Sequence, residues 1–304
     1  MIHRWRKIGQ IYCPSGEKDW RQSHAAVPIA EHVEGDVFKI YFSSRSKFNQ
    51  SFTGYVVVDI TRPQSILELS ANPVLTPGNL GEFDDSGAMA TWLAHHNGMR
   101  FLYYIGWNLG ITVPFRNSIG LAVDKDGGQF IRYASGPILD RTMLEPHFVA
   151  SCCVIPGVDK WRMWHLSCTD WIIRNGKPEH RYHIKYAESS DGVSWRREGV
   201  VAIDYLDSAE YAISRPSVIR DEDRWRMWFS RRGSSYRIGY AESDDGIRWE
   251  RLDAHCGIDV SESGWDCEMI EYPFVFDHGG VRYMLYNGNG YGKTGFGLAV
   301  LDDR

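Results

Sequence analysis

The chain has 304 residues, a formal net charge of -5 and 43% hydrophobic residues, which is enough apolar material for a packed core and excludes a disordered chain. Its 34 Lys and Arg residues are balanced by 39 Asp and Glu and form no long basic block, so the signature of a nucleic-acid binder is missing. The sequence shows neither a signal peptide nor a run of about 18 apolar residues. We therefore expect a cytoplasmic protein without a membrane span.

The six cysteines have neither the C-x-x-C spacing of zinc sites nor the density of a small disulfide framework. We expect reduced thiols in the core, and neither a metal site nor a cofactor. The cysteines are Cys13, Cys152, Cys153, Cys168, Cys256 and Cys267.

Apolar strands recur along the chain and are followed each time by a strand rich in aromatic and β-branched residues. The first strands of these units are predicted at 25–30, 88–94, 150–155, 215–219 and 272–276. The second strands are predicted at 37–45, 99–107, 160–168, 224–232 and 281–289.

A repeated hairpin follows the second strand. YAESSDGVSWRREG at 186–199 and YAESDDGIRWERLD at 240–253 match closely, and LAVDKDGGQFIRYA at 121–134 is a weaker copy. Segments 55–63 and 297–303 occupy the same place without the full turn. Glycine supplies the positive φ of a tight turn, so each Asp-Gly or Gly-Gly pair predicts a hairpin between two strands.

The repeats predict an all-β fold, a five-bladed β-propeller with four antiparallel strands per blade, which forms a single domain over residues 1–304. The N-terminal segment HRWRKIGQIY has no blade of its own, so we expect it to add the outer strand of the last blade and to remove a free sheet edge. A two-sheet sandwich built by duplication is the alternative, and it predicts an even number of similar units.

The starts of the inner strands of a propeller converge on a central tunnel. Acidic residues and histidines at these places suit glycoside cleavage, in which one carboxyl group donates a proton and a second group activates water or attacks the sugar. The alternative is that each carboxylate caps a turn or pairs with a nearby arginine. The candidates are His24, Asp84, Asp85, Glu145, His147, Glu210, Glu268 and Glu271.

Cationic, aromatic and amide side chains at the same places are candidate substrate contacts. Arginine suits a carboxylated sugar or a sugar phosphate, and exposed aromatic rings stack on sugars. Pairing of the arginines with the acidic residues is the alternative. The candidates are Arg45, Arg215, Arg231, Arg232, Trp107, Trp171, Tyr291, Asn287 and Asn289. The Gly-rich segment 286–297 lacks the spacing of a phosphate-binding loop.

Several longer segments carry a resemblance to a known group of enzymes. They include the hairpins SSDGVSW and SDDGIRW, and GWDCEMIEYPFVF at 264–276. With the five-unit layout, they resemble the superfamily of glycoside hydrolase families 43, 32 and 68, and in particular a bacterial glycosylase subgroup similar to proteins of polysaccharide gene clusters. The resemblance implies carbohydrate metabolism. It places Asp85 near the family's second acid and Glu145 near its proton donor, whereas His24 and Ala25 stand where the family has a catalytic Asp in the first blade.

The sequence predicts a carbohydrate-active enzyme, a glycoside hydrolase or transglycosidase that acts on a carbohydrate or a sugar-containing small molecule. Its predicted catalytic residues are Asp85, Glu145, Glu271 and His24, and its predicted substrate-binding residues are His147, Arg45, Arg215, Glu210, Arg231, Trp107, Trp171, Asn287 and Tyr291. The alternative is a non-catalytic propeller that binds a glycan or a glycosylated intermediate, and a protein-protein scaffold is the third choice.

Overall fold

A computed structural model describes residues 3–125 and 127–302. Some predictions lie outside the described residues. They concern the two ends of the domain, residues 1–2 and 303–304, and the tip of the third hairpin copy, Asp126. The described chain is built of β-strands, with one helical turn, α1 (Asn289–Gly292), and one short 3-10 helix, η1 (Asp253–His255). None of the described helices is long and apolar enough to cross a membrane.

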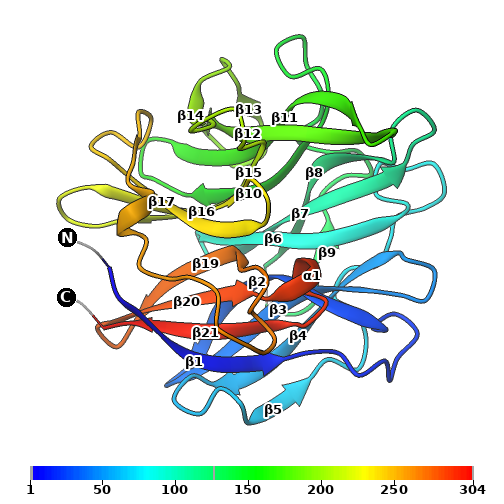
Figure 1. Ribbon diagram of the computed structural model, residues 1–304. Coiled ribbons are helices and arrows are strands. Elements are labelled where there is room, and N and C mark those ends of the chain that lie inside the picture. The colour runs from blue at the N-terminus through cyan, green and yellow to red at the C-terminus, as the bar shows by residue number, and fades with distance from the viewer. Residues whose placement is uncertain (1–2, 126, 303–304) are drawn as a thin grey trace.

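The described strands form groups in which most pair antiparallel with a neighbour in the chain, and hydrogen bonds join these groups into three sheets of eight, nine and four strands, whose twist is visible in Figure 1. The first group contains β2 (Ser23–Glu34), β3 (Val37–Arg45), β4 (Ser51–Asp59) and β5 (Ile66–Leu69), and the next contains β6 (Gly87–His96), β7 (Met99–Leu109), β8 (Phe115–Asp124) and β9 (Ile131–Arg132). Then follow β10 (Val149–Ile155), β11 (Trp161–Arg174), β12 (Lys177–Ser189), β13 (Trp195–Arg196) and β14 (Val201–Ile203). After these come β15 (Ala212–Arg220), β16 (Trp225–Arg232), β17 (Tyr236–Ser243) and β18 (Glu250–Arg251), and finally β19 (Glu271–His278), β20 (Val281–Asn287) and β21 (Phe296–Leu301).

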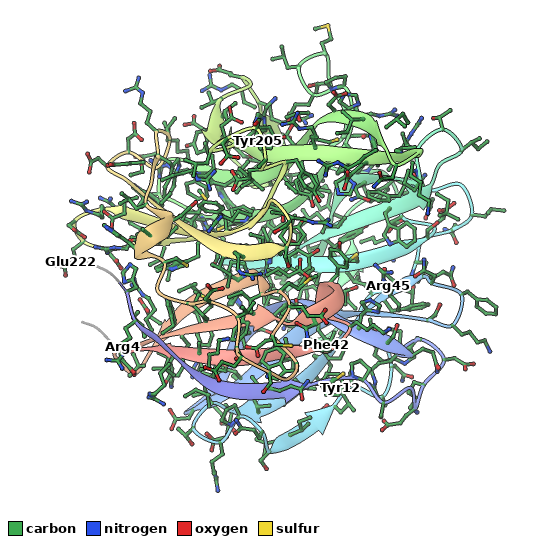
Figure 2. All side chains as sticks on the ribbon, viewed as in Figure 1. Arg4, Tyr12, Phe42, Arg45, Tyr205 and Glu222 are labelled. Atoms are coloured by element: carbon green, nitrogen blue, oxygen red, sulfur yellow. The ribbon has the colours of Figure 1, made fainter. Side chains whose placement is uncertain are left out.

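The strand β1 (Trp5–Tyr12) pairs antiparallel with β21, so the two ends of the described chain share one sheet (Figure 1). The buried ring of Tyr12 lies 4.9 Å from that of Phe42, a contact between β1 and β3 whose two residues are labelled in Figure 2. The N-terminal strand therefore covers the edge of β21 and contributes to the packing against the first group.

The first strands of the groups lie next to one another in chain order. β2 contacts β6, β6 contacts β10, β10 contacts β15 and β15 contacts β19, and β19 contacts β2 again. Hydrogen-bonded links between groups are few, for example the single parallel pairs Ser51 with Gly87 and Tyr182 with Ala212. The groups are thus held together mainly by side-chain packing.

Each of these first strands is interrupted by a shift in register near its start. The shifts lie between Ala26 and Ile29, Ala90 and Trp92, Ala150 and Cys152, Ser214 and Ser217, and Glu271 and Phe274. A bulge bends its strand and turns a side chain in a new direction, which is why bulges recur at functional sites. Five bulges at matching positions therefore shape the region in which the first strands meet.

At three of these bulges a non-glycine residue adopts positive φ, namely Val27 at 56°, Arg215 at 52° and Tyr272 at 55°. At each of these bulges the backbone N–H donates to a side-chain acceptor on a neighbouring strand instead of to the backbone of the sheet. A buried N–H without a hydrogen-bond partner would destabilise the fold. The acceptors are Asn287 Oδ1 for Val27, Ser151 Oγ for Arg215 and Ser230 Oγ for Tyr272.

The repeated hairpins have the predicted turns. Gly192 and Gly246 both take φ of 75°, and the Ser189 and Ser243 hydroxyls each accept the N–H of the turn glycine at 2.9 and 2.8 Å. The Trp164 indole N–H donates to the Gly246 carbonyl at 2.9 Å, so one turn anchors the tryptophan of the preceding group.

All six cysteines are free thiols, but the prediction that all lie in the core is wrong for two of them. Cys13 is exposed and Cys267 is half-buried, because Cys13 follows β1 and Cys267 lies in the loop before β19. The other four cysteines are buried.

Candidate functional site

A cavity of about 470 Å³ lies where the bulges of the first strands meet. Each first strand contributes to its wall. The contributing residues are Val27, Met89, Ala150, Ser151, Ser214, Arg215 and Tyr272. A concave site at the meeting point of several elements is the usual place for a small-molecule ligand.

The rest of the wall comes largely from the ends of the second strands and the starts of the third strands. Because these strands are joined by hairpins, their residues face each other in register: Arg45 with Ser51, Trp107 with Asn117, and Arg232 with Tyr236. The cavity thus opens on the face of the molecule that carries the loops between second and third strands.

Two of the predicted sugar platforms lie in this wall. The Trp107 indole N–H donates to Ser51 Oγ at 3.1 Å, which fixes the plane of the ring. Tyr291 belongs to α1, has φ of 61° and lies edge-on to Tyr236, with a distance of 6.1 Å between the ring centroids. The side chain of Tyr291 is 38% exposed, so its ring is accessible to a ligand.

Trp171 does not line this cavity. Its ring packs edge-on against Phe115 at 5.6 Å and lies 5.7 Å from Phe148, both of which are wall residues. It instead lines a smaller cavity next to His147. Trp171 thus packs behind the aromatic wall of the central cavity, and its stacking on a ligand stays a prediction.

Glu271 is the one predicted acid that lies close to the cavity. It is fully buried, neither carboxyl oxygen has a hydrogen-bond partner among the described residues, and burial raises its pKa well above the usual range despite the charge of Arg232. Burial also raises the pKa of Tyr182, Tyr236 and Tyr272, which line the wall, and the carboxyl group of Glu271 adds to this rise. A buried carboxyl group with a raised pKa thus lies next to the tyrosines.

Glu145 is engaged in an ion pair outside the cavity wall. Its oxygens accept hydrogen bonds from His165 Nε2 at 3.0 Å and from Arg197 at 2.8 Å. Burial opposes ionisation, but the hydrogen bond and charge of His165, together with Ser167 and Arg197, lower the pKa of Glu145 to about 2. A carboxylate held ionised in this way is a poor proton donor at neutral pH. The structure thus places Glu145 in an ion pair, and its catalytic role stays a prediction.

The carboxylates of Asp85 and Glu210 also bind other groups of the protein. Asp85 accepts hydrogen bonds from the Gly81 N–H at 3.1 Å and the Ser86 hydroxyl at 3.0 Å, within the loop before β6. Glu210 binds the Arg251 guanidinium through both oxygens, at 2.6 and 3.0 Å. Neither residue lines the cavity, and both match the alternative in which carboxylates stabilise turns and pair with arginine.

The two predicted histidines occupy different places. His24 has φ of 62° and its Nδ1 lies 2.8 Å from Ser23 Oγ; burial and the charges of Arg45 and Lys293 lower its pKa to about 4. It does not line the cavity, although Arg45 does. His147 lines a second cavity of about 400 Å³ with Arg116 and Arg141. The two cavities share Leu109 and Asn117.

Of the predicted arginines, Arg45 and Arg215 line the cavity and Arg231 does not. Arg231 Nε lies 3.4 Å from Asp253 Oδ2, so it belongs to an ion pair behind the wall. Its neighbour Arg232 points to the other face of the strand and lines the cavity, as expected for alternation along a strand.

Asn287 is not available to a ligand, and this prediction is corrected. Its side chain is fully buried; Nδ2 donates to the carbonyls of Ala25 at 2.7 Å and Gly295 at 2.8 Å, while Oδ1 accepts the Val27 N–H at 2.8 Å. Asn289 similarly holds the loop before β19, since its Oδ1 accepts the N–H of Glu268 at 2.8 Å.

Sequence reasoning missed several wall residues, notably His180, Tyr182, Tyr236 and Tyr272. Their common signal is position, because they lie at or near the start of a first or third strand. Charged residues at such positions stand out in a sequence, whereas tyrosines there look like packing residues. No group of three or more metal-ligating side chains is found within residues 3–125 and 127–302.

The overall fold is similar to that of several solved glycoside hydrolases. A glycosyl hydrolase from Bacteroides ovatus matches with a TM-score of 0.75 and 13% identity over 99% of this chain and 94% of its own. A second glycoside hydrolase matches with a TM-score of 0.72 and 17% identity over 99% and 92%. A thermostable family-43 glycoside hydrolase matches with a TM-score of 0.67 and 16% identity over 92% and 88%. The chain therefore shares its fold with these glycoside hydrolases.

No protein-family model matches the chain. Uncharacterized protein Rv1502 of Mycobacterium tuberculosis (strain ATCC 25618 / H37Rv) is 46% identical over 299 residues, which cover 98% of this chain and 99% of that protein. Uncharacterized protein MT1551 of strain CDC 1551 / Oshkosh has the same identity and coverage. This chain belongs to the family of these mycobacterial proteins.

Proposed function

We propose that the protein is a carbohydrate-active enzyme of the glycoside hydrolase type, with its substrate in the central cavity and Glu271 as the proton donor. The observation that carries this proposal is the buried Glu271 carboxyl behind the wall of the central cavity, which has no hydrogen-bond partner among the described residues and a pKa raised well above the usual range. The carbohydrate class is supported by the similarity in fold to glycoside hydrolases.

The proposal includes the architecture in which the site lies. Each group of consecutive strands is one blade of a five-bladed propeller that forms one domain, and β1 is the outer strand of the last blade. The ring of contacts from β2 through β6, β10, β15 and β19 back to β2 supports this arrangement, as does the bulge at the same place in each of these strands. Its cytoplasmic location stays a prediction.

Glu271 has the properties of a general acid. Burial raises the pKa of its carboxyl group well above the usual range, and a glutamic acid with a raised pKa is suited to give its proton to the oxygen of a leaving sugar. The adjacent residue, Tyr272, lines the cavity and has strained backbone. Proton transfer from Glu271 requires this segment to rotate and bring the carboxyl group to the ligand, and no hydrogen bond to a described residue opposes such a rotation.

Activation of water falls to a histidine in this proposal. Burial and the charge of Arg232 lower the pKa of His180 to about 4, so its imidazole is neutral at pH 7 and able to accept a proton. His180 lines the cavity, stacked on Tyr182 with 4.8 Å between the ring centroids. His24, which is also neutral but lies outside the wall, is the second candidate for this role.

One observation favours a second function, that of a non-catalytic glycan-binding propeller. None of the described residues that line the cavity is Asp or Glu. Most glycosidases use two opposed carboxyl groups, about 5–5.5 Å apart in retaining enzymes and about 6.5–9.5 Å apart in inverting enzymes, and the described wall of this cavity holds no such pair.

The decisive experiment measures turnover and binding together on a panel of aryl glycosides and oligosaccharides. The wild type should hydrolyse at least one member, and Glu271→Gln should reduce kcat by a factor on the order of 10²–10⁴ while the substrate still binds. Glu268→Gln is the matched control, because Glu268 is exposed three residues away, and it should leave kcat unchanged. Binding without turnover in the wild type would establish the glycan-binding function instead, and turnover that survives Glu271→Gln would remove Glu271 from the proposal.

A further inference from the structure

The described wall of the central cavity contains three arginines and no acidic residue. Arg45 comes from the end of β3, Arg215 from the bulge in β15 and Arg232 from the end of β16. None of the three has an ion pair with an acidic side chain among the described residues, within 4.0 Å. The cavity thus gathers positive charge from three different strands.

Arg215 is a buried cation without a counter-charge in the described chain. It is fully buried, Nη2 donates to the Pro28 carbonyl at 3.1 Å, Nη1 donates to the Thr91 carbonyl, and Nε has no partner. Burial lowers its pKa only to about 10, so the guanidinium is charged at pH 7. A buried charge is costly unless an opposite charge compensates it, and an anion in the cavity supplies that compensation.

Arg232 is held in place by aromatic rings. Its guanidinium carbon lies 5.3 Å from the ring centroids of both Tyr211 and Tyr236 and 5.7 Å from that of Tyr291. The carboxyl group of Glu271 makes no hydrogen bond to Arg232 or to any other described residue, and burial raises its pKa well above the usual range despite the charge of Arg232. The planar donors of Arg232 are thus oriented but not used by an acidic partner.

Arg45 is the third cation of the cavity wall. It is half-buried, and Nη1 donates to Asn49 Oδ1 at 3.1 Å, a neutral partner that orients the guanidinium without neutralising it. Both Arg45 and Asn49 line the cavity.

Three arginines outside the cavity wall, in contrast, form ion pairs with acidic side chains. Arg132 is paired with Asp84 at 2.8 Å, Arg197 with Glu145 at 2.8 Å and Arg251 with Glu210 at 2.6 Å. In each of these pairs the acidic residue comes from a neighbouring loop or strand. Other arginines of the protein therefore have acidic partners, whereas the three arginines of the cavity wall have none among the described residues.

We propose that the cavity binds a sugar that carries an anionic group, a carboxylate or a phosphate, held by Arg232 and Arg45 in the field of Arg215. Arginine binds both groups through two parallel N–H donors, and Trp107, with the phenyl rings of the wall, offers the flat apolar surface that sugar rings pack on. This inference rests on the proposed carbohydrate site and specifies the charge of its ligand.

The test compares neutral and anionic members of matched sugar pairs by calorimetry and thermal shift with the intact protein. The probes are glucose, galactose and mannose, their uronates and their 1-phosphates, with inorganic phosphate alone as a further arm. At least one anionic sugar should bind at least about tenfold more tightly than its neutral partner, and added salt should weaken its binding. The uronate and phosphate arms decide which anion is preferred.

Arg232→Gln should abolish this preference, with a loss of about tenfold or more in affinity for the anionic sugar and little change for its neutral partner. Arg45→Gln should give a smaller loss in the same direction. Arg196→Gln is the matched control, because Arg196 is exposed on β13 and pairs with Glu188, and it should bind like the wild type. Unchanged thermal unfolding of ligand-free Arg232→Gln shows that the variant is folded.

The outcomes separate this inference from the proposed function. Equal affinity for neutral and anionic partners, or an anionic preference that Arg232→Gln and Arg45→Gln both retain, overturns the inference and leaves the carbohydrate site standing. Inorganic phosphate that binds as tightly as the sugar phosphates overturns the sugar part of the inference. Failure of every sugar to bind overturns both proposals.

Discussion

The side chain of Asn287 and the backbone of Val27 are joined by a hydrogen bond of 2.8 Å from the Val27 N–H to Asn287 Oδ1. Val27 is β-branched and has φ of 56°, a conformation that costs on the order of 1–3 kcal/mol and persists only where the surroundings enforce it. Asn287 Nδ2 also binds the Ala25 carbonyl, so one amide holds both sides of the bulge. Since Val27 lines the cavity, a residue outside the wall determines part of its shape.

Asn287→Ala should destabilise the protein by about 3 kcal/mol, because it leaves a buried N–H and two buried carbonyls without this partner. Urea unfolding at pH 7 measures the effect. Asn79→Ala is the matched surface control, since the Asn79 side chain is exposed and its Nδ2 donates to Glu82 Oε1 at 3.2 Å, and it should change the free energy of unfolding by less than about 0.5 kcal/mol. Equal effects of the two variants would contradict the role assigned to Asn287.

Glu145→Gln should reduce stability at pH 7 by about 3 kcal/mol, because Arg197 and His165 lose a buried ionised partner. The pKa of Glu145 is about 2 in the folded protein and 4.5 in the reference state, so its contribution is complete above pH 4.5 and is lost as the pH falls toward 2. The difference in unfolding free energy between wild type and variant should therefore shrink over that window.

Unfolding in urea at pH 7, 4 and 3 measures this dependence. Glu198→Gln is the control, because the Glu198 side chain is 63% exposed and pairs with Arg196 on the surface, and it should match the wild type at each pH. A difference between wild type and Glu145→Gln that stays constant from pH 7 to pH 3 would show that the Glu145 ion pair does not stabilise the fold.

The strands were predictable from the sequence because they repeat. The prediction of a second strand at 37–45 matches β3, and that at 224–232 matches β16 to within one residue. Alternation of buried and exposed positions and a turn glycine at fixed spacing are local signals, and several copies reinforce one another. The structure also bears out the positive φ predicted for Gly192 and Gly246.

The functional site was harder to predict from the sequence, because its chemistry depends on which acidic side chain pairs with which arginine from another group of strands. Glu145 and Glu271 are both glutamates near the start of a first strand, yet the pKa of Glu145 is lowered between Arg197 and His165 and that of Glu271 is raised by burial. Their partners, or the lack of them, lie far away in sequence: Arg197 is 52 residues from Glu145. A single sequence shows the residue types at these positions but not which arginine reaches which carboxylate.

Glu271→Gln should make the protein more stable than the wild type at pH 8 and leave its stability unchanged near pH 4. Because the folded-state pKa of Glu271 is raised above 4.5, the folded protein keeps a proton that the unfolded chain loses, and the unfolding free energy of the wild type falls as the pH rises through this range. The loss is about 1.4 kcal/mol per pH unit until the folded-state pKa is reached.

Glutamine resembles the neutral acid and removes this dependence. Thermal and urea unfolding at pH 4, 6 and 8 measure this pH dependence of stability. Glu268→Gln is the exposed control and should keep the pH profile of the wild type. Parallel profiles of the wild type and Glu271→Gln between pH 4 and 8 would mean that Glu271 ionises normally in the folded protein, and its role as a proton donor would then fail as well.

Gly295→Ala should destabilise the fold by several kcal/mol more than Gly279→Ala. Both glycines have positive φ, 84° and 55°, so both substitutions carry a backbone strain of about 1 kcal/mol. A Cβ on Gly295 would lie 1.9 Å from the Tyr12 carbonyl oxygen, whereas a Cβ on Gly279 meets no atom within 4 Å. Because Tyr12 ends β1, relief of the clash requires this strand to move away from β21.

Unfolding free energies of the two variants, together with hydrogen exchange of residues 5–12, measure both effects. Equal destabilisation, with unchanged exchange in β1, would mean that the sheet tolerates this displacement and that β1 is not essential to the closure of the ring.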